Sequence, residues 1–202
     1  MHTINIRHKN SNKVIAAVKV GSGQKGLRGF TFRYLNLAEA TFSHMNLAYC
    51  RFHRCNLRGV TFYSCNLGDA QFHDCDLTGA NLSYVNLTDA EIHGCNLTNA
   101  FLPSPTMMLM AEWGNCTRLL TRDLMRYDAA NHPNPQVFIE WGKNWGNCPY
   151  TETNFQRAAH FKENRSLIRY DFLKLPVKSA HNLMVRLLKE RCPLTKFDKG
   201  KI

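Results

Sequence analysis

The stretch "CNLGDAQFHDCDLTGANL", residues 65–82, places a large apolar residue at every fifth position. These residues are Leu67, Phe72, Leu77 and Leu82. An α-helix places apolar residues three and four apart, and a half-buried strand places them two apart. A period of five fits neither pattern. It predicts a backbone in which a short straight side and a corner repeat every five residues.

The five-residue period runs without an insertion through sixteen centres. The centres are Leu27, Phe32, Leu37, Phe42, Leu47, Phe52, Leu57, Phe62, Leu67, Phe72, Leu77, Leu82, Leu87, Ile92, Leu97 and Leu102. Two residues before each centre from Leu37 onward lies a second, usually smaller apolar residue, such as Leu35, Cys65 or Ala70, and the residue between them is mostly polar. Apolar, polar, apolar directs two side chains to one side of a short strand, and the Gly, Ser, Thr, Asp and Asn residues that follow favour a turn. One such side cannot bury its apolar pair alone, so the chain is predicted to coil.

Longer periods indicate how many sides one coil has. Phenylalanine alternates with leucine every ten residues from Phe32 to Phe72, and His53, His73 and His93 recur every twenty. A coil of four sides places positions twenty apart directly above one another, at the strand spacing of about 4.8 Å. The sequence therefore predicts a mainly β solenoid, a quadrilateral β-helix of about four coils.

The repeats "ANLSY", "VNLTD" and "CNLTN", within residues 80–99, resemble the pentapeptide-repeat family, whose motif is commonly written A(D/N)LXX. The resemblance covers residues 25–102. It implies a right-handed quadrilateral β-helix in which the centre and the residue two before it face inward. Members of the family are structural or binding modules of diverse role, so the resemblance does not name a function.

The segments on either side are predicted to close the solenoid, because exposed coil ends are unpaired strand edges. Residues 1–24 hold "INIRH" and "VIAAVKV" around a polar "KNSNK", which predicts a β-hairpin cap. Residues 25–102 are the β-helix. Residues 103–202 begin with two prolines and then show apolar residues at helical spacing, which predicts a helical cap. The resemblance also implies a homodimer contact through the C-terminal helices.

Composition predicts a cytoplasmic protein that does not cross a membrane. No window holds eighteen uninterrupted apolar residues, and the first residues lack the apolar run of a signal peptide. Five of the eight cysteines occupy the small inward position of a repeat, where a reduced thiol acts as a small hydrophobic residue. These five are Cys50, Cys55, Cys65, Cys75 and Cys95.

Charge is the main indication of a partner. Residues 1–25 hold five basic and no acidic residues, residues 26–102 hold five and six, and residues 103–202 hold sixteen and nine. Some pentapeptide-repeat proteins protect DNA gyrase with a strongly acidic, duplex-like rod, a role that needs a negative surface. Here the first half of the rod is positive, which argues against duplex mimicry; its arginines are Arg28, Arg33, Arg51, Arg54 and Arg58. Binding of a topoisomerase through another surface stays open.

Six arginines are candidates for partner binding. Arg118, Arg122 and Arg126 lie four apart on a predicted helix, opposite an apolar face, and such a stripe can bind phosphates or an acidic partner. The alternative is a helix face that is charged only because it is solvated. Arg33, Arg54 and Arg58 on the predicted rod complete the set.

The column His53, His73 and His93 is a metal candidate. Each histidine follows a centre by one residue, so the three side chains point outward one above another. Neighbouring imidazoles can share a metal ion, but stacked polar residues are also an ordinary way to fill a flat solenoid face. We therefore expect no resident metal.

No set of residues in the sequence predicts catalysis, and we expect no enzymatic activity, catalytic residue or cofactor. The favoured hypothesis is a rigid scaffold that binds a protein partner, with a topoisomerase or gyrase modulator as a narrower form. The alternative is a nucleic-acid-binding protein whose basic terminal regions contact phosphates.

Overall fold

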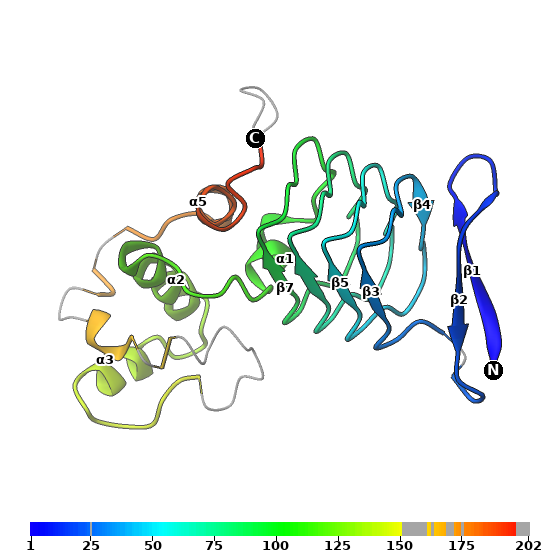
Figure 1. The fold of residues 1–202 in the computed structure, drawn as a ribbon. Coiled ribbons are helices and arrows are strands. Elements are labelled where there is room, and N and C mark those ends of the chain that lie inside the picture. Colours follow the sequence, from blue (N-terminus) through cyan, green and yellow to red (C-terminus); the bar gives the residue numbers. More distant parts are fainter. Residues whose placement is uncertain (25, 151–160, 163, 169–171, 175, 197–202) are drawn as a thin grey trace.

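The computed structural model describes residues 1–24, 26–150, 161–162, 164–168, 172–174 and 176–196. A hairpin at the N-terminus is followed by a solenoid of very short strands and then by a group of helices. Figure 1 shows these three parts in a row, with the turns of the solenoid stacked side by side between the hairpin and the helices. The chain is thus a β-helix type solenoid with a helical region, as the sequence predicts.

The hairpin consists of β1 (His2–His8) and β2 (Val14–Val20), which pair antiparallel. Its inward residues Ile6, Val18 and Val20 are buried. Only the end of β1 pairs with the solenoid: Arg7 and His8 lie opposite β4 (Ala40–Thr41). An ion pair of 2.6 Å between Lys9 and Glu39 adds to this junction.

The solenoid is held by parallel pairing between residues twenty positions apart. Strands β3 (Thr31–Arg33), β5 (Arg51–His53), β6 (Gln71–His73) and β7 (Glu91–His93) form one parallel sheet in this register. Single parallel bridges repeat the same offset in three further columns, which begin at Asn36, Thr41 and Asn46. We call the four sets the strand column, the Asn36 column, the Thr41 column and the Asn46 column.

The inside of the solenoid is filled by the predicted centres. Phe52 is fully buried and its ring stacks on Phe32 at 4.7 Å and on Phe72 at 4.9 Å between centroids. Phe42 and Phe62 form a second stack at 5.2 Å and meet the first edge-on. Both arrangements, offset stacking and edge contact, are favourable for aromatic rings, so the core combines large apolar area with fixed geometry.

The Asn or Asp that precedes many centres stabilises the turn that follows. The side-chain oxygen of Asn66 accepts a hydrogen bond from the backbone N–H of Gly68 at 3.1 Å. Asn86 repeats this bond and also donates its amide to Asn66 at 3.1 Å. Such side-chain to backbone bonds are why Asn and Asp favour turns, and here the same side chains also link one coil to the next.

The small inward position, two residues before a centre, is occupied by cysteine as well as alanine. The Cys65 thiol donates to the carbonyl of Phe42 in the preceding coil at 2.8 Å, and Cys50 donates to Leu27 at 2.9 Å. Burial raises the pKa of both thiols to about 11, because the thiolate would be held away from water. All eight cysteines of the chain are free thiols.

The second residue after each centre from Leu27 to Leu97 turns the corner with a left-handed backbone. Asp69, Asp74 and Asp89 have φ values of 55–56°, and Gly79 has a φ of +67°. Asp, Asn and Gly reach this region most easily. The same corner position is occupied by other residue types with positive φ, which are Tyr34, Glu39, His44, Tyr49, Arg54, Ser64 and Tyr84.

The helical region contains α1 (Pro105–Leu109), α2 (Arg118–Ala130), α3 (Gln136–Gly142), a short 3₁₀ turn η1 (Arg165–Leu167) and α5 (Ala180–Arg191). Ser104 caps α1 by accepting from the Met107 N–H, and Ser179 caps α5 in the same way through Asn182. The Pro- and Asn-rich residues 131–135, "NHPNP", separate α2 from α3, and such a composition favours a turn.

The last coil is covered by the chain's own C-terminal part. After α1 the chain returns to the strand column, where Glu112 forms a parallel bridge with Glu91. Then α5 and the residues after it close the end. The backbone carbonyl of Arg191 accepts a hydrogen bond from the Gly94 N–H, and the Thr195 hydroxyl accepts one from the Leu97 N–H at 2.9 Å. These bonds satisfy backbone groups that a bare coil end would leave unpaired.

The first coil departs from the predicted burial pattern. Leu35, predicted to face inward, is 37% exposed, and Met45 is only partly buried. These positions have no coil before them, and the hairpin reaches only as far as β4 on this end of the solenoid. An inward side chain is therefore buried only where a neighbouring layer covers it.

Replacing Phe52 with alanine is expected to destabilise the protein by about 3–5 kcal/mol, because it opens a cavity within the stack of rings. Phe101, which is 65% exposed, is the matched control, and its change to alanine is expected to cost within about 0.5 kcal/mol. Urea denaturation measures both values. An equal loss of unfolding free energy in the two variants would contradict a filled core at Phe52.

Replacing Gly79 with alanine is expected to destabilise the protein by about 1–2 kcal/mol, through backbone strain alone. The added Cβ meets no atom within 4 Å, but φ is +67°. Gly21 also has open space around it and lies outside the left-handed region, so Gly21→Ala is the control. If denaturation shows the same change for both variants, the corner imposes no conformational cost.

Stability is expected to fall as the pH rises from about 8.5, where the thiols of the unfolded chain ionise, to about 11, where Cys50 and Cys65 ionise in the folded protein. A raised pKa in the folded state means that the unfolded chain loses its protons first, so alkaline solution favours unfolding. Urea denaturation at pH 7.5 and pH 10 tests this. The Cys65→Ala variant should show a shallower fall, and an unchanged fall would contradict the explanation.

Candidate partner-binding surfaces

One side of the solenoid carries no charged residue. We call residues 40–44, 60–64, 80–84 and 100–104, which follow the Thr41 column, the uncharged face. They include no Lys, Arg, Asp or Glu, although the chain has a net charge of +11. Tyr63, Tyr84 and Phe101 are exposed there, Tyr84 at 77%. Depletion of charge with enrichment of aromatic residues is the composition of a protein interface core.

The aromatic residues of the uncharged face form a ladder along the solenoid. The rings of His44 and Tyr63 meet edge-on at 5.6 Å, and those of Tyr63 and Tyr84 at 5.4 Å. His44 and Tyr84 lie at left-handed corners, with φ values of 62° and 58°. Each ring is thus supported by a neighbour and offers a fixed apolar surface with a polar tip.

Within the hairpin and the solenoid, the positive charge lies in residues 1–68. Residues 1–68 hold ten basic residues and one acidic residue, and that residue, Glu39, pairs with Lys9. Residues 69–102 hold five acidic residues and no Lys or Arg. The near-neutral total for residues 26–102 therefore conceals two segments of opposite sign.

The three arginines predicted on the rod differ in their surroundings. Arg54 lies 3.5 Å from Asp74, and Arg58 lies 3.1 Å from Asp76, each pair joining neighbouring coils. Partial burial acts to raise the Asp76 pKa, but hydrogen bonds from the Thr78 backbone and hydroxyl, together with the Arg58 guanidinium, outweigh it and lower this pKa. Arg33 is exposed at the end of β3, and no carboxylate of the described residues pairs with it. Arg33 is thus the most available of the three.

The prediction that Arg126 belongs to an exposed stripe on α2 is wrong. Its guanidinium is buried and donates to the carbonyls of Phe172 at 3.1 Å and Pro176 at 2.9 Å. It therefore holds the chain between η1 and α5 against α2 and is closed to a partner. Arg122 is partly buried beside Asp123, and only Arg118 is exposed.

The histidine column exists, but each member has a different neighbour. The rings of His73 and His93 stack at 5.2 Å, and those of His53 and His73 lie 6.4 Å apart. The Glu91 carboxylate is 3.3 Å from His73 Nε2, and an Arg191 nitrogen is 3.1 Å from His93 Nδ1. A guanidinium at a ring nitrogen disfavours a metal cation there. Within the described residues, no group of three or more His, Cys, Asp or Glu side chains is arranged to bind a metal ion.

Two of these features, the carboxylate in the histidine column and the uncharged face, could have been found in the sequence. Glu91 lies two residues before His93, so it points outward on the same strand and belongs to the histidine column. The uncharged face appears when the chain is written in rows of twenty, since its charge-free residues then align in one block. The Arg191 contact with His93 spans ninety-eight residues and has no local signal.

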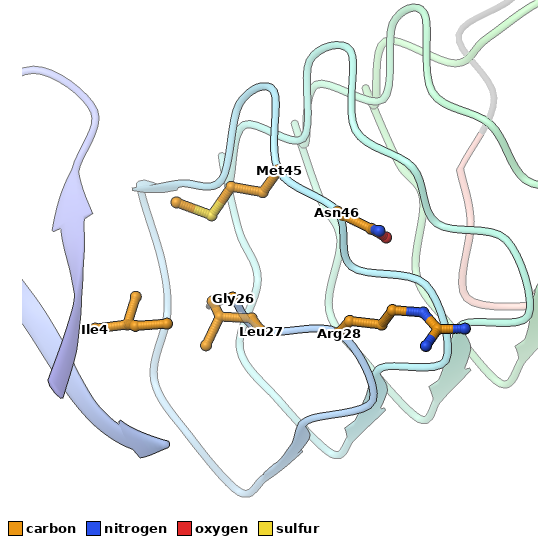
Figure 2. Close-up of a pocket in the computed structure, with 6 residues that line it drawn as sticks. All are labelled: Ile4, Gly26, Leu27, Arg28, Met45 and Asn46. Carbon is orange, nitrogen blue, oxygen red and sulfur yellow. The ribbon is translucent and has the colours of Figure 1, made fainter. Parts of the chain in front are cut away.

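A cavity of about 500 Å³ lies between the hairpin and the first coil. Figure 2 shows Ile4 of β1 facing Leu27 and Met45 across it, whereas the Arg28 side chain extends away from Ile4 along the coil. Gly26 and Asn46 complete the lining. This set holds no carboxylate, imidazole or thiol, so it offers no acid–base or nucleophilic chemistry.

The described helices include none that is long and apolar enough to span a bilayer.

The model of the family described as pentapeptide repeat region matches residues 28–102. No curated protein matches the chain. Among solved structures, a pentapeptide repeat protein from the Arabidopsis thaliana thylakoid lumen is 23% identical, with a TM-score of 0.28, over 39% of this chain and 57% of the other. Rfr23, a pentapeptide repeat protein from the cyanobacterium Cyanothece 51142, is 24% identical, with a TM-score of 0.24, over 36% and 53%.

QnrB1, a plasmid-mediated fluoroquinolone resistance protein, is 20% identical, with a TM-score of 0.12, over 42% of this chain and 61% of the other. The chain spans little more than half the length of the first two structures. The family match coincides with the unbroken run of five-residue repeats and with the pairing at an offset of twenty. Residues 28–102, which form the solenoid, match the model of the pentapeptide-repeat family.

Proposed function

We propose that this protein is a non-enzymatic scaffold that binds a protein partner through the uncharged face. The observation that carries the proposal is a charge-free surface with exposed Tyr63, Tyr84 and Phe101 on a chain of net charge +11. A solvated surface has no need of exposed aromatic rings, whereas a protein interface is enriched in them and depleted of charge at its centre.

In this proposal, the four columns are the four sides of a right-handed quadrilateral coil, and the coil repeats about four times. Pairing at an offset of twenty in each column supports this geometry. One side of such a rod measures roughly 19 Å by 16 Å from the strand spacing and the rise per residue, or about 300 Å². A standard interface buries about 800 Å² per partner, so the contact is small and transient unless it extends beyond this side.

The rigid core suits a scaffold. The stacked rings of Phe32, Phe52 and Phe72 and the bonds between coils hold the face in one shape before a partner arrives. A preformed face loses little conformational entropy on binding, which partly offsets its small area.

A topoisomerase modulator is the narrower form of the proposal. The acidic segment 69–102 is the feature in its favour. However, Asp74 and Asp76 are paired with arginines, and Asp89 is buried, so the segment presents little free negative charge. We therefore leave the protein partner general.

We also propose a cellular compartment and consider a homodimer. The free state of all eight cysteines supports a reducing compartment such as the cytoplasm. A homodimer through the C-terminal helices would need residues other than Leu183 and Leu187, because α5 buries these against its own chain.

The test is affinity capture with the wild-type protein and the Tyr84→Arg variant, each with nuclease treatment. Arginine places a charge at the most exposed ring of the uncharged face and is expected to reduce the retained partner at least tenfold, through desolvation of an unpaired cation. Mass spectrometry identifies and quantifies what is retained.

Asn99→Arg is the matched control. Asn99 is exposed, follows the Asn36 column and lies at the same kind of corner, with a φ of 57°. This variant should retain the partner at the wild-type level. Equal retention by the Tyr84→Arg variant, or loss of all bound material after nuclease treatment, would refute the proposed face.

A further inference from the structure

We propose that the first coils of the solenoid bind single-stranded nucleic acid. The site is a group of five exposed residues on and beside the strand column, which we call the arginine–tyrosine patch: Arg28, Arg33, Tyr34, Tyr49 and Arg51. It belongs to a different column from the uncharged face, so the inference adds a second partner to the proposed function and does not depend on the first.

The three arginines of the patch have no acidic partner among the described residues. Arg51 donates to the neutral amide of Gln71 at 3.0 Å, and its charge remains uncompensated. The hairpin adds exposed Arg7, Lys13 and Lys19 at the same end of the molecule. Uncompensated arginines attract phosphates and release their counterions, which is the main source of affinity for nucleic acid.

The backbone register brings these side chains together. β3 pairs with β5 so that Thr31 lies opposite Arg51 and Arg33 lies opposite His53. The two arginines therefore project from neighbouring strands on the same side of the sheet, about 4.8 Å apart in the pairing direction. Together they line a positive surface that crosses the first strands.

The two tyrosines flank this surface at its corners. Tyr34 directly follows β3 and is 65% exposed, and Tyr49 shortly precedes β5 and is 48% exposed. The Arg28 guanidinium lies over the Tyr49 ring at 4.7 Å, and the His53 ring meets Tyr34 edge-on at 5.8 Å. Each ring is thus held by one neighbour and keeps exposed surface on which a base can stack.

The backbone makes this placement of tyrosine costly. Tyr34 and Tyr49 have φ values of 57° and 62°, in the left-handed region that bulky side chains avoid. Asp69 and Gly79 occupy the same corner position with the residue types that reach it easily. A large ring that is both strained and exposed stabilises nothing in the core, and such positions concentrate at functional sites.

The rings also distinguish the form of nucleic acid. A duplex offers phosphates to the arginines, but its bases are already stacked and cannot reach Tyr34 or Tyr49. A single strand offers both phosphates and free base faces, and combined positive charge and aromatic stacking is how such strands are bound without sequence preference.

The test is fluorescence anisotropy with a labelled single-stranded oligonucleotide of about twelve thymidines, a length within the range of known single-strand sites. Three phosphate contacts predict a loss of affinity of roughly tenfold to twentyfold between 50 mM and 200 mM salt. The Arg33→Gln/Arg51→Gln variant should lower affinity at low salt and flatten this dependence. The Tyr34→Leu/Tyr49→Leu variant should lower affinity roughly thirtyfold or more, from about 1 kcal/mol or more per stacked base, and leave the salt dependence unchanged.

Lys178→Gln/Lys189→Gln is the matched control, since it removes the same charge from exposed positions of the helical region. It is expected to bind the oligonucleotide within twofold of wild type. An equal loss in this control, equal affinity for a duplex of the same length, or no binding of the single strand at 50 mM salt would overturn the inference. Thermal unfolding of every variant shows whether it is folded, and the protein-capture result is independent of all these outcomes.

Discussion

Every part of this structure depends on the pairing of each short strand with the strand twenty residues later. A three-residue strand has too few hydrogen bonds to be stable alone, but Phe52 and its neighbours bond to both the preceding and the following coil. The same register stacks ring on ring in the core and Asn on Asn at the surface. It also leaves the two ends unpaired. The hairpin covers one end in part, and Arg191 at the end of α5 and Thr195 after it cover the other.

The solenoid could be predicted from the sequence because its determinants are local and repeated. The period of five marked the inward residues, and the longer periods of ten and twenty placed Phe32, Phe52 and Phe72 in one stack. The small inward position explained buried Cys65. The helical region was predicted less well, since its contacts join distant segments. Arg126 has the spacing of a surface residue and yet binds carbonyls forty-six and fifty positions later. No local pattern encodes such a partner.

The candidate surfaces were partly visible in the sequence and partly hidden by averaging. Counting charge over residues 26–102 gave a nearly neutral rod, whereas the excess of positive charge up to residue 68 separates Arg33 and Arg51 from the acidic second half. The strained corners were hidden for another reason. A period of five shows where the chain turns, but only the backbone angles show that Tyr34, Tyr49 and Tyr84 turn it at a cost. At the corner position, stability thus favours Gly, Asn or Asp, whereas the proposed binding surfaces use tyrosine.

The uniform register also limits how a chain of this kind changes in length during evolution. Removal of one residue would turn every later inward side chain toward a corner, and removal of five would rotate every later side by one column. Removal of twenty, for example from Arg51 to Ala70, would return each residue to its own column and shorten the rod by one strand spacing. Gene duplication and deletion in units of a whole coil would therefore alter the length of a binding face while keeping the caps at both ends.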